Sequence, residues 1–402
     1  MKEKPYKEIN LFSFDKTYST KVNLKIPKTH EEIESFSLKS EYLISRGAGY
    51  SYVAASFKNQ SLSLCMGNFK KILKFDKEKK LITVESGITI VELLNYTLSF
   101  GLWIPQIPGY PFITIGGAIA SNVHGKSAGS DGTIRNSIKE ILIYIKNNGW
   151  LNLSKDKNKD IFDLTIGGLG LTGTIANVTL QLSDFNYLKF ETTATKTASI
   201  NETVDLIKNN KLSNNFIYSW NKTNINTKNF GEGIIFSNKI DQKNKGSLNN
   251  LKFKKKNFSK YFNIPRIWNN TSIRIFNYLF FNYHNLFKKN TYEENFINVI
   301  FPFFGKEMYF SFFGRKGFIE SQILIPYEKV EEFLENFISL AKIHQPLITL
   351  FSAKGMSGEQ KYLRFEGNMI CLTFDFVKNK KNLNFINELD KLYVKHNILP
   401  SI

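Results

Sequence analysis

The chain has 402 residues, enough for two or three domains with sizeable hydrophobic cores. Its 42% hydrophobic fraction is typical of a globular protein, and the sequence has no run of 18 apolar residues to span a membrane. Cys65 and Cys371 are its only cysteines, which excludes a disulfide framework or a zinc cluster. The N-terminal stretch lacks the apolar core of a signal peptide, so we expect a soluble, reduced, cytoplasmic protein without a metal.

The net charge of +19 has two interpretations. It indicates either an anionic partner, such as nucleic acid, a membrane surface or a phosphorylated substrate, or a lysine-rich composition spread over a solvated surface. The sequence contains no recognisable nucleic-acid-reading module, so we expect no nucleic-acid partner. Basic and aromatic residues interleave between 251 and 289, as on helices at an anionic membrane surface. The alternative is an aromatic stripe that packs on its own domain.

The first part of the chain alternates between strand and helix patterns. Residues 81–84 are rich in β-forming side chains, and residues 90–98 have helical spacing. The alternation over residues 137–153 predicts a hairpin with an Asn-Gly turn. Residues 174–182 alternate with β-branched side chains and predict another strand. We therefore expect residues 1–185 to form a mixed α+β domain.

The composition shifts to Asn, Lys and Phe after about residue 186. This shift predicts a separate domain over residues 186–402, with a flexible basic-aromatic insert at about 222–290. The pattern of residues 318–351 predicts strand, helix, strand. Residues 368–377 then predict a further strand and residues 382–397 a helix.

Two glycine motifs resemble nucleotide-binding motifs but lack the residue or the following helix that such motifs require. The HGKS stretch at 124–127 resembles the end of a nucleotide-binding P-loop, but that motif needs glycine where Ala120 stands. The GLGLTG stretch at 168–173 matches the dinucleotide pattern, but a strand rather than a helix follows it. We therefore expect neither an NTPase nor a Rossmann fold.

Two further glycine segments support each other. In residues 45–52, SRGAGYSY, Gly47 and Gly49 allow successive backbone N–H groups to turn inward as an anion-binding nest; the alternative is a surface turn. A second segment at 108–125, PGYPFITIGGAIASNVHG, follows some sixty residues later. Two such loops, each joined to a strand, can hold a diphosphate from both sides.

In order and spacing, these segments resemble the vanillyl-alcohol-oxidase-type flavoprotein family. Its FAD domain carries a first glycine loop, then PG…TxGGxxxxxxHG, then GGxGxxG; the counterparts here are Arg46–Tyr52, Pro108–Gly125 and Gly167–Gly173. The resemblance runs from about residue 10 to the C-terminus and thins at 222–295. It implies a two-subdomain PCMH-type FAD-binding domain and an α+β substrate (cap) domain with an antiparallel sheet.

The resemblance also implies how FAD is held. Some members attach FAD through a histidine in the first loop; this loop has none, so we expect non-covalent FAD. Gly116 and Gly117 are expected to let the backbone approach the diphosphate, and Ser121–His124 to run along the flavin. The cofactor-binding residues implied are Ser45, Arg46, Gly47, Ala48, Gly49, Tyr50, Ser51, Tyr52, Gly109, Thr114, Ile115, Gly116, Gly117, Ser121, Asn122, Val123, His124, Gly173 and Ile175.

Oxidation of an alcohol by flavin requires a hydride aimed at the flavin and a group that takes or shares the hydroxyl proton. By resemblance, His124, Lys126 and Lys354 would hold a lipid-linked phosphate and stabilise negative charge. Gln322 would hydrogen-bond the sugar or the flavin, and Cys371 would lie beside the flavin. The alternatives are a satisfied loop histidine for His124, a solvated lysine for Lys354 and a small buried hydrophobe for Cys371.

Within the family, the likeness extends to members that oxidise a polyprenyl-phosphoryl pentose to its 2-keto form at the inner face of the cell membrane. An NAD(P)H-dependent reductase would then complete an epimerisation. The alternatives are a sugar-alcohol or aldonolactone oxidase of the same fold, or a catalytically degenerate FAD-binding subunit.

Two departures from these relatives bear on the substrate. They carry a tyrosine and a substrate-contacting lysine after the last helix, where this sequence reaches Ile402. They also carry polar and histidine side chains where this sequence has SAGSDG at 127–132. The first departure leaves open a truncated chain, a second chain that supplies those groups, or a different substrate.

Overall fold

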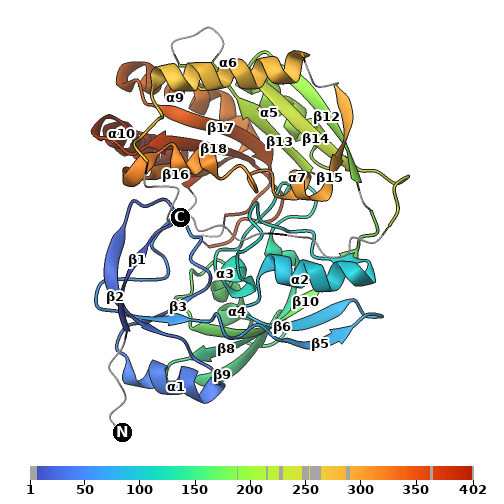
Figure 1. Cartoon of the computed structure of the whole chain (residues 1–402), viewed down its shortest axis with the longest axis vertical. Helices are drawn as coiled ribbons and strands as arrows, with labels where there is room; N and C mark the ends of the chain where they lie inside the picture. The colour runs from blue at the N-terminus through green and yellow to red at the C-terminus, as the bar shows by residue number, and fades with distance from the viewer. Residues whose placement is uncertain are drawn as a thin grey trace. The chain divides into compact units, whose positions relative to one another are not determined.

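The chain divides into two compact units in the computed structural model, coloured along the chain in Figure 1. Unit 1 consists of residues 1–124, 133–187 and 246–255, and unit 2 of residues 125–132, 188–245 and 256–402. The chain thus enters unit 2 before unit 1 is complete. The structure describes residues 7–187, 189–213, 216–225, 230–246, 253, 264–286, 290–362 and 365–400.

Unit 1 begins with a four-stranded sheet in the order β1-β2-β4-β3. The β1–β2 pair is antiparallel, whereas β4 runs parallel to both β2 and β3. Helix α1 (His30–Lys39) crosses from β2 to β3 and buries Ile33 against Leu64 of β4. The strands are β1 (Lys7–Phe12), β2 (Ser19–Lys25), β3 (Leu43–Arg46) and β4 (Leu62–Cys65). Strand β3 therefore leads directly into the first glycine loop.

The second sheet of unit 1 has five antiparallel strands in the order β5-β6-β10-β8-β9. Its strands are β5 (Ile72–Asp76), β6 (Leu81–Glu85), β8 (Ile138–Ile145), β9 (Gly149–Ser154) and β10 (Thr174–Gln181). The predicted hairpin is confirmed as β8–β9, as are the strands β6 and β10. The smaller elements are α3 (Ile115–Ala120), α4 (Lys159–Thr165), η1 (Leu98–Phe100), η2 (Ile134–Ser137) and the paired β7 (Leu102–Trp103) and β11 (Ser183–Asp184).

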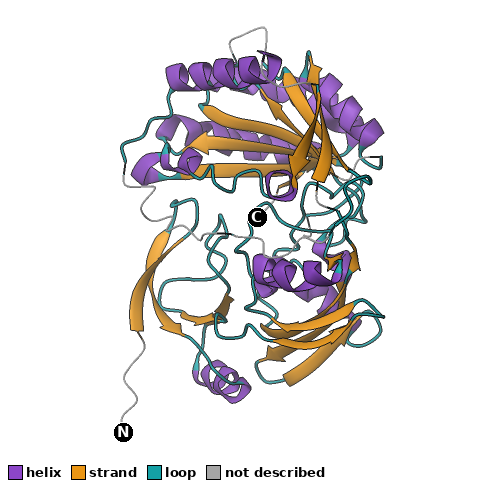
Figure 2. Cartoon of the chain, turned by 45° about the vertical axis from the view of Figure 1, so that its right-hand side comes forward, coloured by secondary structure: helices purple, strands orange, loops and turns teal. Residues whose placement is uncertain are grey.

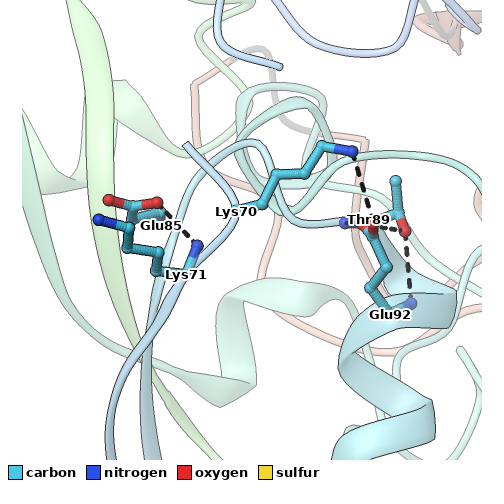
Figure 3. A network of polar contacts seen from close by, with 5 residues as sticks. All are labelled: Lys70, Lys71, Glu85, Thr89 and Glu92. Atoms are coloured by element: carbon cyan, nitrogen blue, oxygen red, sulfur yellow. Dashed lines mark hydrogen bonds and ion pairs between the residues drawn. The ribbon is translucent and has the colours of Figure 1, made fainter. Parts of the chain in front are cut away.

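Helix α2 (Ile90–Thr97) begins with a capping box, shown in Figure 3. The Glu92 N–H donates to Thr89 Oγ1 (3.3 Å), and the Thr89 N–H donates to Glu92 Oε2 (2.8 Å). Lys70 adds an exposed ion pair, with its Nζ 3.5 Å from Glu92 Oε1. These contacts fix where the chain turns from β6 into the helix.

Unit 2 contains two four-stranded antiparallel sheets, β13-β14-β12-β15 and β17-β18-β16-β19. They adjoin where the Ala353 N–H donates to Ser219 Oγ (2.9 Å), joining β17 to β13. The first sheet contains β12 (Lys189–Thr197), β13 (Phe216–Asn221), β14 (Gly233–Ile240) and β15 (Thr291–Asn295). The second contains β16 (Phe318–Ile325), β17 (Ile348–Gly355), β18 (Ile370–Val377) and β19 (Leu399–Pro400).

Helices α5 (Ile200–Asn210), α9 (Val330–His344) and α10 (Lys380–His396) share one apolar core with the strands of unit 2. Phenylalanines of α9, β17 and β18 stack in this core, and Phe385 of α10 meets Phe337 of α9 edge-on. Helix α6 (Asn270–Leu286) packs against Ile234 and Phe236 of β14, whereas Ile235 faces the core. Figure 2 shows the helices of unit 2 in purple beside its strands. The short elements are α7 (Phe296–Ile300), α8 (Met308–Ser311), η4 (Gly314–Lys316) and η5 (Tyr327–Lys329).

The predicted strands and helices from residue 318 onward are confirmed as β16, α9, β17, β18 and α10. The expected flexible insert over residues 222–290 is wrong where the structure describes it. Residues 233–240 form β14, an inner strand, and residues 270–286 form α6, because alternate apolar side chains of β14 are buried on both faces. Of the same segment, residues 226–229, 247–252, 254–263 and 287–289 lie outside the described residues. No helix in the described ranges combines the length and apolarity needed to cross a membrane.

Candidate functional site

The three glycine segments meet in unit 1. A Cβ added to Gly47 would lie 2.1 Å from Thr114 Oγ1, so the first loop touches the second segment where only glycine fits. Ser45 Oγ lies 2.8 Å from Thr174 Oγ1, which joins the end of β3 to the start of β10. The third segment closes the arrangement, because the Gly167 N–H donates to Ile119 O at the end of α3 (3.0 Å). The segments therefore form one cradle around α3.

The two glycines at the start of α3 are used within the protein. The Gly116 N–H donates to Ser86 O (2.7 Å), and an added Cβ would lie 2.9 Å from Ser86 Cβ. The Gly117 N–H donates to Thr114 Oγ1 (3.3 Å), the N-cap of the helix. Gly116 therefore serves the close packing of α3 on the β6–α2 turn.

The first loop offers donors that the protein does not use. The N–H groups of Gly47, Ala48 and Gly49 donate to no residue that the structure describes. Gly49 has φ +79°, and its missing Cβ makes room for the Arg46 guanidinium, whose Nη2 would lie 2.2 Å from such an atom. Arg46 Nη1 is held by Ser56 Oγ at 2.7 Å. Unused N–H groups beside a fixed guanidinium favour an anion.

Aromatic side chains hold the rest of this loop. The Tyr50 ring lies 4.9 Å from that of Tyr110 in the second segment, and the Phe14 ring lies 5.2 Å from that of Tyr52. The Phe14 N–H donates to Ser51 O (2.9 Å). Burial raises the pKa of Tyr50 to about 12, so its phenol keeps its proton at neutral pH.

The chain after α3 turns sharply and pairs with the strand that returns to unit 1. Asn122 is buried with φ 43°, and the Val123 N–H donates to Ala118 O (2.9 Å). His124 forms an antiparallel bridge with Thr133. The remaining expected residues of unit 1 are Gly109 between β7 and α3, Ile115 in α3, exposed Ser121 at its C-cap, Gly173 before β10 and Ile175 within β10.

In unit 2, the strands β16, β18 and β17 present a polar face on the side opposite the apolar core. Lys354 lies opposite Cys371 in the β17–β18 register, and Gln322 lies opposite Thr373 in the β16–β18 register. Side chains two positions apart on a strand share a face, so these four residues lie on one side and Phe374 on the other. The structure therefore brings Gln322, Lys354 and Cys371 onto one surface.

The segment 125–132 packs on the same surface. Ala128 contacts Leu324 and Cys371, and the backbone of the segment accepts hydrogen bonds from the N–H groups of Ile217 and Ser357 (3.2 and 3.0 Å). Lys126 Nζ lies 5.3 Å from the centre of the Tyr218 ring. Burial, and then the charge of Lys354, lower the pKa of Lys126 to about 7. Of the five expected catalytic residues, Lys126, Gln322, Lys354 and Cys371 thus belong to unit 2, and His124 belongs to unit 1.

Residues 26–154 match the family described as an FAD binding domain. The chain is 27% identical over 363 residues to decaprenylphosphoryl-beta-D-ribose oxidase of Mycolicibacterium smegmatis, covering 87% of this chain and 77% of that protein. It is 31% identical to L-gulonolactone oxidase of Mus musculus over 29% of this chain and 26% of that protein. It is 33% identical to L-galactono-1,4-lactone dehydrogenase of Arabidopsis thaliana over 28% of this chain and 18% of that protein.

Residues 26–154 thus form an FAD binding domain, and the chain is similar to FAD-linked oxidoreductases of the vanillyl-alcohol-oxidase type. The cofactor of the protein is FAD. The protein is an oxidoreductase that acts on CH–OH groups. The α+β fold with a PCMH-type domain, expected from the sequence, is confirmed.

The residues of unit 1 fit FAD. The N–H groups of Gly47, Ala48 and Gly49, with Arg46 beside them, supply donors and positive charge for a diphosphate. Within the described ranges no cluster of three His, Cys, Asp or Glu residues could hold a metal ion.

Sequence reasoning missed several residues of the unit 2 polar face. Glu320 precedes Gln322 by two positions, and Asp375 follows Cys371 by four, so both share the face of their neighbours. Tyr309 donates to Asp375 Oδ2 (2.8 Å). The period-2 alternation of residues 318–325 could have revealed Glu320, but Tyr309 comes from a short helix with no such signal.

Proposed function

We propose that this flavoenzyme oxidises a ring hydroxyl of a polyprenyl-phosphoryl pentose to the 2-keto sugar. The relative from Mycolicibacterium smegmatis, whose name specifies a lipid-phosphoryl ribose, aligns over both units of this chain. The observation that carries the proposal is the lysine pair of unit 2. Burial and the charge of Lys354 lower the pKa of Lys126, and a bound phosphodiester would favour the charged form of Lys126.

In this proposal each side chain of the polar face has a task. Lys126 and Lys354 hold the phosphate, and Gln322 hydrogen-bonds a sugar hydroxyl. FAD, when bound, supplies the acceptor for the hydride that leaves the carbinol carbon. Cys371 stays a neutral thiol beside the sugar site, because burial raises its pKa although Lys354 opposes that shift. The hydroxyl proton leaves to solvent, and His124 stabilises the negative charge that develops on the oxygen.

We propose that FAD is bound without a covalent link. The first loop presents Tyr50, Ser51 and Tyr52, and Tyr50 keeps its proton at neutral pH. Acid precipitation of the purified protein separates the two cases. Flavin that remains in the supernatant supports the proposal, and flavin that sediments with the protein contradicts it.

The experiment that tests the substrate is an anaerobic titration followed by visible absorbance. A polyprenyl-phosphoryl ribose analogue is expected to bleach the oxidised flavin, and the same sugar without phosphate to bleach it far less. Flavin that stays oxidised with the phosphorylated sugar, but is reduced by another sugar, contradicts the proposal.

A second candidate is a sugar-alcohol or aldonolactone oxidase. Local similarity to the two lactone-oxidising proteins supports it, although that similarity covers less than a third of this chain. The two candidates differ in the substrate that bleaches the flavin and in reoxidation. Rapid reoxidation by air together with a soluble lactone substrate favours the second candidate.

We propose that the enzyme works at the inner face of the cell membrane with an NAD(P)H-dependent reductase, which completes an epimerisation. Helix α6 supports the membrane contact, because Ile275, Tyr278, Leu279 and Tyr283 are exposed along one side, next to exposed Arg274. Sedimentation with anionic and with neutral vesicles tests this contact. Binding to anionic vesicles that the variant Tyr278→Ser/Leu279→Ser loses supports it, whereas equal absence of binding to both contradicts it.

A further inference from the structure

Two carboxyl groups oppose each other on the polar face of unit 2. Glu320 of β16 lies directly opposite Asp375 of β18 in the antiparallel register. The Cβ atoms of such cross-strand partners lie about 4.5–5.5 Å apart, so the carboxyl groups can reach each other. Asp375 is 1% exposed and Glu320 is half-buried. The two side chains interact, and this interaction contributes to the raised pKa of Asp375.

This pair keeps one proton. Two ionised carboxylates in such a place repel each other, and burial penalises each charge. Burial, and then the charge of Glu320, hold the pKa of Asp375 well above its usual range. Asp375 is therefore the protonated member and the donor, while the more exposed Glu320 is the carboxylate.

Further groups hold Asp375 in place. The Tyr309 hydroxyl of α8 donates to Asp375 Oδ2 (2.8 Å) and lies 2.8 Å from Thr349 Oγ1 of β17. Burial holds the pKa of Tyr309 well above its usual range, so its phenol stays a donor. Tyr309 and Glu320 are the titratable groups that face Asp375 in the described structure. Lys354 and Cys371 lie at the other end of the face.

The carboxylate of Glu320 determines how Gln322 is oriented. Gln322 Nε2 donates to Glu320 Oε1 at 2.5 Å. An ionised carboxylate only accepts hydrogen bonds, so it selects the NH₂ end of the amide over the carbonyl end. The carbonyl oxygen of Gln322 is then left as an acceptor for a hydroxyl group.

We propose that Glu320 and Asp375 form a proton-sharing pair that positions Gln322, which presents its carbonyl oxygen to a hydroxyl of the sugar. The two carboxyl groups act through Gln322 and do not touch the substrate. This inference rests on the proposed function, because it takes Gln322 as a substrate-binding group. It adds a specificity rule: a sugar that lacks the hydroxyl leaves the Gln322 acceptor unpaired and is rejected.

The first test needs no substrate. Infrared difference spectra of the flavin-loaded enzyme across a pH titration are expected to show the carbonyl stretch of a protonated carboxylic acid at neutral pH. Asp375→Asn removes this band, whereas Glu328→Gln, at an exposed position on η5, leaves it. A spectrum without the band, or a band that survives in Asp375→Asn, overturns the proton-sharing pair.

The second test concerns positioning. Glu320→Gln is expected to raise KM about tenfold with a smaller change in kcat, because a neutral amide no longer selects one end of Gln322. Asp375→Leu raises KM as well, and Asp375→Asn, which still donates to Glu320, restores most of the loss.

The outcomes separate this inference from the proposed function. If the wild type oxidises no sugar, the proposed function fails, and the infrared band still decides whether the pair shares a proton. If the wild type oxidises the sugar but Glu320→Gln retains the wild-type KM, the positioning role is overturned.

Discussion

Gly47 and Thr114, which lie 67 positions apart in the sequence, meet so closely that a single added carbon would sit 2.1 Å from the threonine hydroxyl oxygen. The same oxygen accepts the Gly117 N–H at the start of α3. One contact therefore couples the first glycine loop to α3, which lies within the second glycine segment and contacts the third. We therefore expect FAD binding to depend on this contact.

Gly47→Ala is expected to purify with much less flavin than the wild type. The new methyl group displaces Thr114, which loosens the N-cap of α3 and shifts the loop with its unused N–H groups; loss of such a cap costs about 1 kcal/mol. The measurement is the ratio of flavin to protein absorbance. Gly67→Ala serves as the control, because its Cβ would meet only Cys65 Sγ at an ordinary 3.6 Å.

A second substitution sharpens that prediction. Thr114→Ala removes the hydroxyl that Gly47→Ala strikes, so the double variant is expected to recover part of the flavin that Gly47→Ala loses. Additive losses in the double variant would show that the two residues act independently and would contradict the contact.

The kcat/KM for a phosphorylated sugar is expected to fall as pH rises through about 7. The pKa of Lys126 is lowered to about 7, so the free enzyme carries this charge below that pH and loses it above. Lys126→Met removes the pH dependence and lowers kcat/KM about tenfold, in line with the loss of one charge-assisted hydrogen bond. Lys342→Met, at an exposed position on α9, is the control. If kcat/KM for a sugar without phosphate falls in the same way as pH rises, the role of Lys126 in holding the phosphate is contradicted.

Asp375→Asn is expected to stabilise the folded protein increasingly as pH rises. The pKa of Asp375 is raised above its ordinary value of 3.8, so above that pH the unfolded chain ionises while the folded chain keeps the proton. Wild-type stability is thereby lost from about pH 4 upward, by about 1.4 kcal/mol for each unit of pKa difference. Thermal unfolding at several pH values measures this trend, with Asp205→Asn on the exposed side of α5 as control. If the difference in Tm between Asp375→Asn and the wild type shrinks toward alkaline pH, the prediction is contradicted.

The two cysteines are expected to react differently with iodoacetamide at neutral pH. Cys371 is fully buried and its thiol pKa is raised, whereas Cys65 is partly exposed at the end of β4. Mass spectrometry of the native protein should therefore find the label on Cys65 first. Equal labelling of both residues in the folded enzyme would show that the Cys371 thiol is accessible and ionised.

Local patterns predicted much of this architecture. The alternation of the hairpin and the strand–helix–strand run from residue 318 each reflect a single element that buries one face, so their periods are visible in the sequence. Strand β14 was missed because it is buried on both faces and stands among lysines and asparagines. Its apolar run does not alternate.

The candidate site also combines features that local patterns predict with features that they do not. The glycine segments could be recognised together, but the role of Gly116 could not, because its close contact is with Ser86, thirty positions earlier. Glu320 and Gln322 share a face by alternation alone. Their partner Asp375 depends on the register between β16 and β18, which no local pattern encodes.

Unit 2 needs the segment 125–132, which precedes most of it in the chain, to cover its strands. Its backbone accepts hydrogen bonds from Ile217 and Ser357, residues that leave the ribosome long after it. A fragment that starts at residue 188 would lack Lys126 and Ala128 and would expose the strands they cover. Unit 2 therefore cannot be separated as residues 188–402 alone, and an exchange of this unit between relatives must include residues 125–132 as well.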